Sequence, residues 1–288
     1  MRKKFKNNCE YFLLIFFYFL SKMIGLKKSS LLGGMFLSIY GIFSSKNKIA
    51  MKNLNKVFPN KSLKEKKIII KKMWSHFGRV IGEYPHLNHI KALNNKYIKI
   101  EGIENLLLPL KKNRNCLFFS AHLGNWELTS HPLIESGYKI SFIYRSPNNK
   151  KVDKLLRKIR LNYGVDLIRK GSVGAKKCIK LLKEEKGNIG MLIDQKMNDG
   201  VETIFFGYKT MTASAIAKFS IKYKCPIIPS VCKRNDNINF VIKYLPEISY
   251  EKVKELGTET KVMNLLNNYV ESWIKESPEQ WIWIHNRW

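Results

Sequence analysis

Short apolar runs alternate with helix-forming segments from residue 97 onward, and this alternation restricts the fold more than any other feature of the sequence. The run 116–120, Cys-Leu-Phe-Phe-Ser, is apolar up to its last residue, which is typical of a strand buried on both faces. Strands that alternate with helices in this way form a mainly parallel sheet with helices on both faces, so we predict an α/β fold. The predicted strands are 97–101, 116–120, 139–144, 165–168, 188–193, 226–232 and 240–245.

A helical region precedes this alternation. Ser62 and Glu65 have the spacing of a capping box, which predicts a helix over 63–84. The sequence contains no internal repeat and no low-complexity linker. We therefore predict a single α/β domain over residues 46–288, preceded by an N-terminal helical segment over residues 1–45.

The N-terminal segment has the composition of a membrane-associating element. A basic head is followed by an apolar run over 11–20, and a second apolar stretch covers 31–43. Each stretch is shorter than the roughly 20 residues that a helix needs to cross a bilayer. The aromatic residues beside the basic head favour a membrane over a buried core helix. An uncleaved signal anchor, a helix lying in the membrane plane and a cleaved signal peptide stay open as alternatives.

The positions of the basic residues and the cysteines suggest a location. Basic residues at the start of an apolar segment tend to stay on the cytoplasmic side of the membrane. The five cysteines form no CxxC pair, which indicates neither a disulfide framework nor a zinc site and fits a reducing compartment. We expect the basic end and the body of the chain to lie on the cytoplasmic side of a membrane.

The formal net charge of +30 favours an acidic partner. A nucleic acid, an anionic membrane surface and a phosphorylated substrate all meet this requirement. The excess comes mostly from lysines spread over the whole chain, so part of it can reflect genome composition and a solvated surface. A basic nucleic-acid-binding protein is kept as a remote alternative, because the sequence has no recognition module of that class.

One segment carries the residue types of acid–base catalysis. His122 follows the predicted strand 116–120, Gly124 allows a tight turn, and Asn125 is a good helix N-cap. Glu127 then falls in the first helical turn, where the helix dipole stabilises a carboxylate. We expect Glu127 to fold back and hold one nitrogen of the His122 ring, leaving the other nitrogen as a base.

The same segment, His-Leu-Gly-Asn-Trp-Glu at 122–127, resembles the His-x4-Asp/Glu motif of the glycerolipid acyltransferase superfamily. More narrowly, it resembles the lipid A biosynthesis lauroyl/myristoyl acyltransferase family. The similarity extends from about residue 30 to the end of the sequence, and its matching segments occur in the same order. These segments are 53–59, Tyr144-Arg145, Asp194-Gln195, 205–207 with Thr210, and 278–288.

The resemblance implies a membrane enzyme, without metal or organic cofactor, in which His122 and Glu127 are catalytic. It implies acyl transfer from acyl carrier protein to a hydroxyl of a lipid A precursor, a phosphorylated glycolipid. It also implies that Arg145 binds phosphate or the carrier arm, with a surface ion pair as the alternative. Arg169 and Arg160 are weaker candidates of the same kind, and the remaining predicted substrate-binding residues are Asn125, Asp194, Gln195 and Gly207.

The acceptor pocket cannot be read from the sequence. An acyltransferase of the same mechanism that acts on a lysophospholipid, a glycolipid or an aminolipid is therefore an alternative. A catalytically silent relative is a further alternative, which the intact His122 and Glu127 disfavour.

Overall fold

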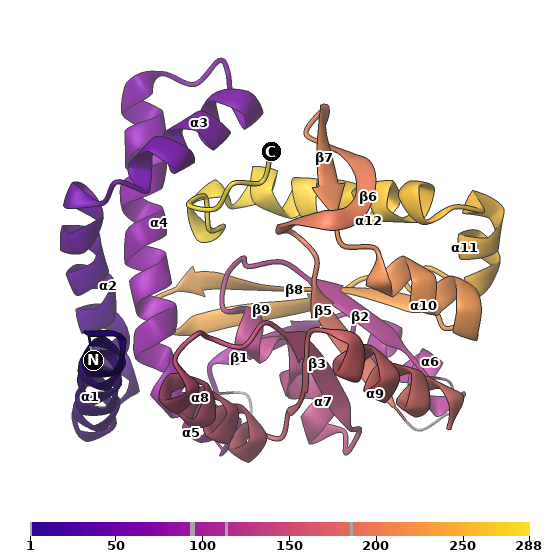
Figure 1. Ribbon diagram of the computed structural model, residues 1–288, viewed down its shortest axis with the longest axis horizontal. Helices are drawn as coiled ribbons and strands as arrows, with labels where there is room; N and C mark the ends of the chain where they lie inside the picture. Colours follow the sequence, from indigo (N-terminus) through magenta and orange to yellow (C-terminus); the bar gives the residue numbers. More distant parts are fainter. Residues whose placement is uncertain (1, 93–95, 113–114, 185–186) are drawn as a thin grey trace.

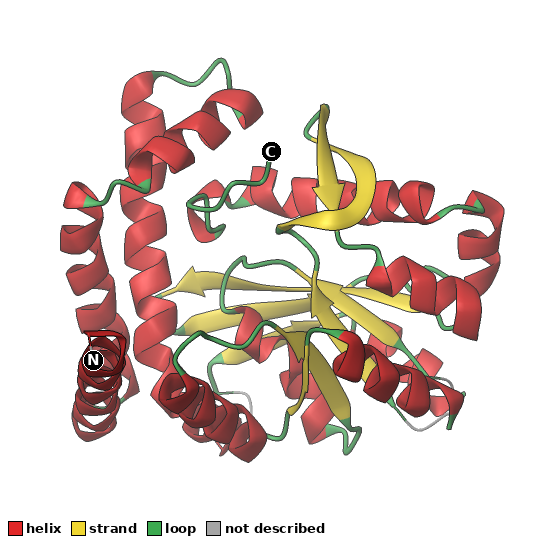
Figure 2. Cartoon of the chain, viewed as in Figure 1, coloured by secondary structure: helices red, strands yellow, loops and turns green. Residues whose placement is uncertain are grey.

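The structure is a computed structural model that describes residues 2–92, 96–112, 115–184 and 187–288. Within these residues, seven strands form one sheet in the order β1-β9-β8-β2-β5-β3-β4, and β6 and β7 form a separate hairpin (Figures 1 and 2). The strands are β1 (Ile98–Glu101), β2 (Leu117–Ser120), β3 (Ile140–Tyr144), β4 (Asp166–Arg169), β5 (Asn188–Leu192), β6 (Lys196–Phe205), β7 (Tyr208–Thr212), β8 (Ile227–Asp236) and β9 (Asn239–Tyr244).

The mainly parallel α/β fold is confirmed. Strands β8, β2, β5, β3 and β4 run parallel to one another, whereas β9 is antiparallel to β8 and parallel to β1. All seven predicted strands are present in this sheet, with ends shifted by a few residues. The β6–β7 hairpin was not predicted. Its first strand begins with a polar, Gly-containing stretch and a register irregularity between Lys196 and Val201, so it lacks the alternation of a regular strand.

Helices cover both faces of the sheet, and two hydrophobic cores result. Within β2, Leu117 and Phe119 face one core, while Phe118 faces the other, as expected for a strand buried on both sides. The helices are α1 (Arg2–Ile24), α2 (Leu26–Phe43), α3 (Asn47–Val57), α4 (Leu63–Glu83), α5 (Leu87–Ala92), α6 (Ile103–Lys111), α7 (His131–Glu135), α8 (Lys150–Tyr163), α9 (Ser172–Lys183), α10 (Ala215–Tyr223), α11 (Tyr250–Leu256) and α12 (Glu259–Glu276), with 3₁₀ turns at Tyr84–His86, Trp126–Ser130 and Pro278–Gln280. Helices α4, α9, α10 and α12 contribute to the first core, and α5 to α8 contribute mainly to the second.

Helices α2 and α4 pack side by side at the edge of the domain (Figure 1). Helix α4 begins at the predicted capping box, in which Ser62 and Glu65 bond reciprocally. The two helix backbones approach so closely that a Cβ atom added at Gly33 would lie 2.3 Å from the Gly78 carbonyl oxygen. Glycine is required at such a contact because any side chain would push the helices apart. The α2–α4 pair is therefore a tightly packed unit.

The outer sides of α1 and α2 expose an apolar surface. In α1, Phe12 and Phe16 have exposed fractions of 66% and 67%, and in α2, Phe36 and Ile39 have exposed fractions of 70% and 60%. Lys27 and Lys28 are exposed at the start of α2. Among the described residues, no helix has both the length and the apolar character needed to cross a membrane.

Candidate active site

Two neighbouring parallel strands bring His122 and Asp194 together. Strands β2 and β5 are paired so that Ser120 lies opposite Leu192, and each functional residue follows two positions later. The His122 Nδ1 atom lies 2.9 Å from Asp194 Oδ1, and the His122 backbone N–H donates to Asp194 Oδ2 at 3.0 Å. This is the carboxyl edge of a parallel sheet, where ligands bind in folds of this class.

Asp194 is a buried anion whose two carboxylate oxygens both accept hydrogen bonds. Its exposed fraction is 0%, and Trp281 Nε1 donates to Oδ2 at 2.7 Å. Burial by itself would raise the pKa of Asp194, but the attraction of His122 and the hydrogen bonds from His122 and Trp281 outweigh it, and the pKa of this carboxyl is held below its ordinary range. An ionised Asp194 accepts a hydrogen bond from Nδ1–H, so His122 Nε2 is the nitrogen that can act as a base.

The predicted contact between Glu127 and the His122 ring is wrong. Glu127 does lie in the first turn of the 3₁₀ helix that follows the motif, but its carboxylate points to Arg160. Arg160 Nε donates to Oε2 at 2.9 Å and Arg160 Nη2 donates to Oε1 at 2.5 Å, while Trp126 Nε1 donates to Oε1 at 3.1 Å. Burial would lower the pKa of Arg160, but the Glu127 charge outweighs it and raises the pKa. Charge attraction to the guanidinium therefore decides the orientation of Glu127.

The turn between His122 and Glu127 is held by its main chain. Gly124 has φ +60°, and an added Cβ would lie 1.7 Å from the Cys232 carbonyl oxygen, so the predicted tight turn at this glycine is confirmed. Asn125 occupies the predicted N-cap position, but its side chain makes no cap hydrogen bond. Asn125 is buried, and its Nδ2 donates to Glu83 Oε2 at 2.9 Å. Asn125 is therefore a structural contact of the loop and does not line the cavity described next.

His122 opens into a large apolar cavity of about 1040 Å³. This volume is at the upper end of the range of about 300–1,000 Å³ for small-molecule sites. Glu127 and Arg160 also line the cavity, and the Trp126 ring lies edge-on to the His122 ring with 5.2 Å between centroids. The walls come from elements between α1 and α10. Apolar lining residues include Leu14, Phe77, Phe142, Leu155, Leu167 and Phe219.

The other predicted site residues divide into two groups. Arg145, Arg169 and Gln195 are exposed residues that line the cavity, each following or ending a strand at the same sheet edge. Arg169 also donates to Asp153 at 3.0 Å. Gly207 was predicted to bind substrate, but it lies with φ +77° in the turn between β6 and β7, outside the cavity. Its role is to form the hairpin turn, for which a positive φ is required.

Comparison with known protein families places the chain. A search among curated proteins found no match. A family model described as bacterial lipid A biosynthesis acyltransferase matches residues 2–288, which includes the N-terminal helices, the His122 loop and the C-terminal segment. This match confirms the resemblance seen in the short motifs. The chain belongs to the bacterial lipid A biosynthesis acyltransferase family, and is an acyltransferase of lipid A synthesis.

Proposed function

We propose that the protein transfers a fatty acyl group from an acyl carrier protein thioester to a hydroxyl of a phosphorylated lipid A precursor, with His122 as general base. The observation that carries this proposal is the His122–Asp194 pair at the wall of the apolar cavity. The His122–Asp194 pair places a base of fixed tautomer beside a cavity whose apolar lining suits hydrocarbon chains. No protein nucleophile is required, because the acceptor hydroxyl attacks the thioester directly.

The proposed reaction proceeds in two proton-coupled steps. His122 Nε2 removes the proton from the acceptor hydroxyl as its oxygen attacks the thioester carbonyl carbon, and a tetrahedral oxyanion forms. The carbon–sulfur bond then breaks, and the His122 imidazolium returns the proton to the leaving thiolate. The products are an ester on the acceptor and a free thiol on the carrier arm. Asp194 stabilises the transient imidazolium from the Nδ1 side.

Arg160 is a cation of the cavity wall, and Glu127 fixes its position. Two of the guanidinium nitrogens donate hydrogen bonds to Glu127, so the orientation of the Arg160 guanidinium is set before substrate binds. We assign Arg160 to stabilisation of the negative charge that develops on the carbonyl oxygen. Arg145, which is exposed at the rim of the cavity, suits a phosphate of the acceptor or of the carrier arm.

The acceptor is tested by acyl transfer with the full-length protein in vesicles. Acyl carrier protein thioesters are supplied with a tetra-acylated lipid A precursor, several lysophospholipids and an aminolipid. Transfer to the lipid A precursor alone supports the proposal. Transfer to a lysophospholipid or aminolipid alone keeps the mechanism and replaces the acceptor. No transfer to any acceptor by well-folded protein contradicts the proposed function.

Glu127→Gln should lower kcat by about 10- to 100-fold, because a neutral amide no longer fixes or balances the Arg160 guanidinium. KM for the acceptor should change little if Arg160 acts mainly on the developing oxyanion. The measurement is steady-state transfer at varied acceptor concentration. Asp166→Asn is a matched control, since it neutralises a carboxylate of an exposed ion pair with Lys177 outside the cavity. Equal activity of the two variants would remove Glu127 from the catalytic machinery.

The apolar surface of α1 and α2 suggests how the protein meets its lipid substrate. We propose that this surface lies on the cytoplasmic face of the bacterial inner membrane. Exposed lysines beside it would face anionic headgroups, and the inner side of α1 contributes Leu14, Phe17 and Tyr18 to the cavity wall. A helix that contacts the bilayer on one side and the active-site cavity on the other gives an acyl chain a short apolar path.

Phe36→Glu with Ile39→Glu should weaken binding to anionic vesicles by about tenfold or more, since each exposed apolar side chain can contribute on the order of 1 kcal/mol on insertion. The measurement is vesicle co-sedimentation at two salt concentrations, and binding should fall at the higher salt. Leu108→Glu is the control, because Leu108 is 57% exposed on α6, away from α1 and α2. If the double variant binds as tightly as the control, another surface contacts the membrane.

A further inference from the structure

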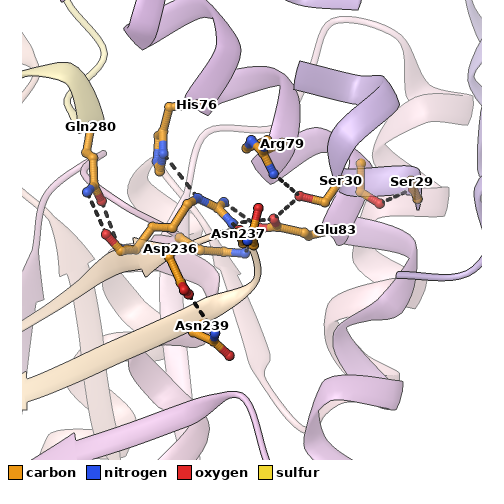
Figure 3. A network of polar contacts seen from close by, with 12 residues as sticks. Ser29, Ser30, His76, Arg79, Glu83, Asp236, Asn237, Asn239 and Gln280 are labelled. Atoms are coloured by element: carbon orange, nitrogen blue, oxygen red, sulfur yellow. Dashed lines mark hydrogen bonds and ion pairs between the residues drawn. The ribbon is translucent and has the colours of Figure 1, made fainter. Parts of the chain in front are cut away.

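The carboxylate of Glu83, at the end of α4, is completely buried and joins three separate parts of the chain (Figure 3). Ser30 Oγ of α2 donates to Oε1 at 2.6 Å. Arg234 of β8 donates to both oxygens, at 2.6 Å from Nη1 and 2.9 Å from Nη2. Asn125 lies in the segment from His122 to Glu127, which we call the catalytic loop, and its Nδ2 donates to Oε2 at 2.9 Å. One buried anion therefore connects the N-terminal helix pair, the sheet and the catalytic loop.

Arg234 is itself fixed in place from several sides. The Gln280 side chain bonds both the N–H and the carbonyl of Arg234, each at 2.8 Å. Arg234 Nε donates to His76 Nδ1 at 3.3 Å, and Nη1 also donates to the Asn237 carbonyl. Burial and the Arg234 charge lower the pKa of His76 to about 3, so its ring is neutral and can accept this bond. The cation that faces Glu83 thus has little freedom to move.

Asn125 is the point at which this network meets the active site. It lies three residues after His122 and two before Glu127, and its side chain bonds Glu83 instead of lining the cavity. The neighbouring Gly124 N–H donates to the Gln280 carbonyl at 3.1 Å. The loop is therefore held to the Glu83–Arg234 pair by a side chain and to the Gln280 segment by its main chain.

The stability of the fold alone does not explain why the charged side chains of Glu83 and Arg234 are buried together. Removing a carboxylate and a guanidinium from water costs about as much as their attraction returns, and apolar residues of similar volume often stabilise a core as well or better. A buried pair does fix positions, because each of its hydrogen bonds has a preferred direction and a missing partner is costly. The pair at Glu83 is bonded to the one loop whose position sets the distance between base and substrate.

We infer that Glu83 and Arg234 are positioning residues that hold the catalytic loop in a fixed position against the α2–α4 helix pair. This inference rests on the proposed acyl transfer, for which the loop carries the base. The close α2–α4 packing at Gly33 and Gly78 makes the helix pair a firm support, and Ser30 transmits its position to Glu83. The membrane-facing helices and the catalytic base are thereby coupled through four hydrogen bonds to a single carboxylate.

Ser30 and Ser29 provide a matched pair of variants. Both serines are buried on α2 and both donate one hydrogen bond to α4, but Ser29 Oγ bonds the Gly82 carbonyl at 2.5 Å and has no bond to Glu83. Ser30→Ala should lower kcat by about tenfold and Asn125→Ala by about 10²-fold, because small displacements of a reacting group have large effects on rate. Ser29→Ala should retain the wild-type kcat. KM should stay near the wild-type value in all three variants, and both serine variants should lose similar thermal stability.

Hydrogen exchange of the loop amides separates this inference from the proposed function. The Gly124 amide, which bonds the Gln280 carbonyl, should exchange faster in Ser30→Ala and Asn125→Ala than in Ser29→Ala. That comparison holds even if wild-type protein transfers no acyl group to any acceptor, an outcome that would contradict the function alone. Equal kcat and equal exchange in Ser30→Ala and Ser29→Ala would overturn the positioning role.

Discussion

Asp194→Asn should lower kcat by about 10³- to 10⁴-fold, although the substitution only replaces one carboxylate oxygen by an NH₂ group. Asp194 Oδ2 accepts hydrogen bonds from the His122 backbone N–H and from Trp281 Nε1, so the amide oxygen of asparagine must occupy that position. The amide NH₂ then faces His122 Nδ1 and donates to it. The ring is forced to carry its proton on Nε2, where a general base needs a lone pair. A wrong tautomer of this kind costs about 10⁴-fold in serine proteases.

The measurement is kcat of purified Asp194→Asn protein in vesicles, with KM and thermal stability determined in parallel. KM should be close to the wild-type value, because Asp194 is buried and does not line the cavity. Trp281→Phe is a useful companion, since it removes one donor to Oδ2 and leaves the His122 tautomer unchanged. Wild-type turnover in Asp194→Asn would show that another group orients the base.

His122→Ala should reduce transfer to the uncatalysed background, a loss of about 10³-fold or more for a general base. The loop should keep its shape, because the His122 main chain still donates to Asp194 and still accepts from the Ile282 N–H. Transfer is measured with the lipid A precursor as acceptor, and vesicle binding is measured as the control. Binding should be unchanged, since the residues that we propose to face the membrane are on α1 and α2.

The His122→Asn variant tests whether His122→Ala is inactive only because it fails to fold. Its amide nitrogen can take the place of Nδ1 and donate to Asp194, so the buried carboxylate keeps its partner while the base is lost. An alanine variant that is inactive and unstable beside an asparagine variant that is inactive and stable would still support the base. An asparagine variant that turns over at the wild-type rate would remove His122 from the reaction.

The sheet could be predicted because each of its strands has a local signature. The 116–120 run is apolar on both faces, and β2 has both faces buried. The position of His122 followed from its place after that strand. The β6–β7 hairpin escaped prediction because its pairing depends on the turn at Phe206 and Gly207, where both residues have positive φ, and on the irregular start of β6.

The partner of His122 could not be predicted from spacing. Glu127 is close in sequence, whereas Asp194 is 72 residues from His122 and reaches it through the pairing of β2 with β5. The competing cation, Arg160, lies 33 residues from Glu127 on α8. Local spacing shows which groups can meet, but tertiary contacts between charges decide which do. Arg160 was recognised as a weak candidate, and Glu83 and Arg234 carried no sequence signal.

The C-terminal segment has a consequence for the order in which the enzyme becomes active during its synthesis. Leu123 forms a bridge with Trp281, the Ile282 N–H donates to the His122 carbonyl, and Trp281 completes the donors of Asp194. These residues leave the ribosome long after α1 and α2, whose apolar surface is translated first. A nascent chain can therefore reach a lipid surface before Trp281 and Ile282 contact the His122–Asp194 pair, and the full set of hydrogen bonds around this pair forms only after translation has passed residue 282.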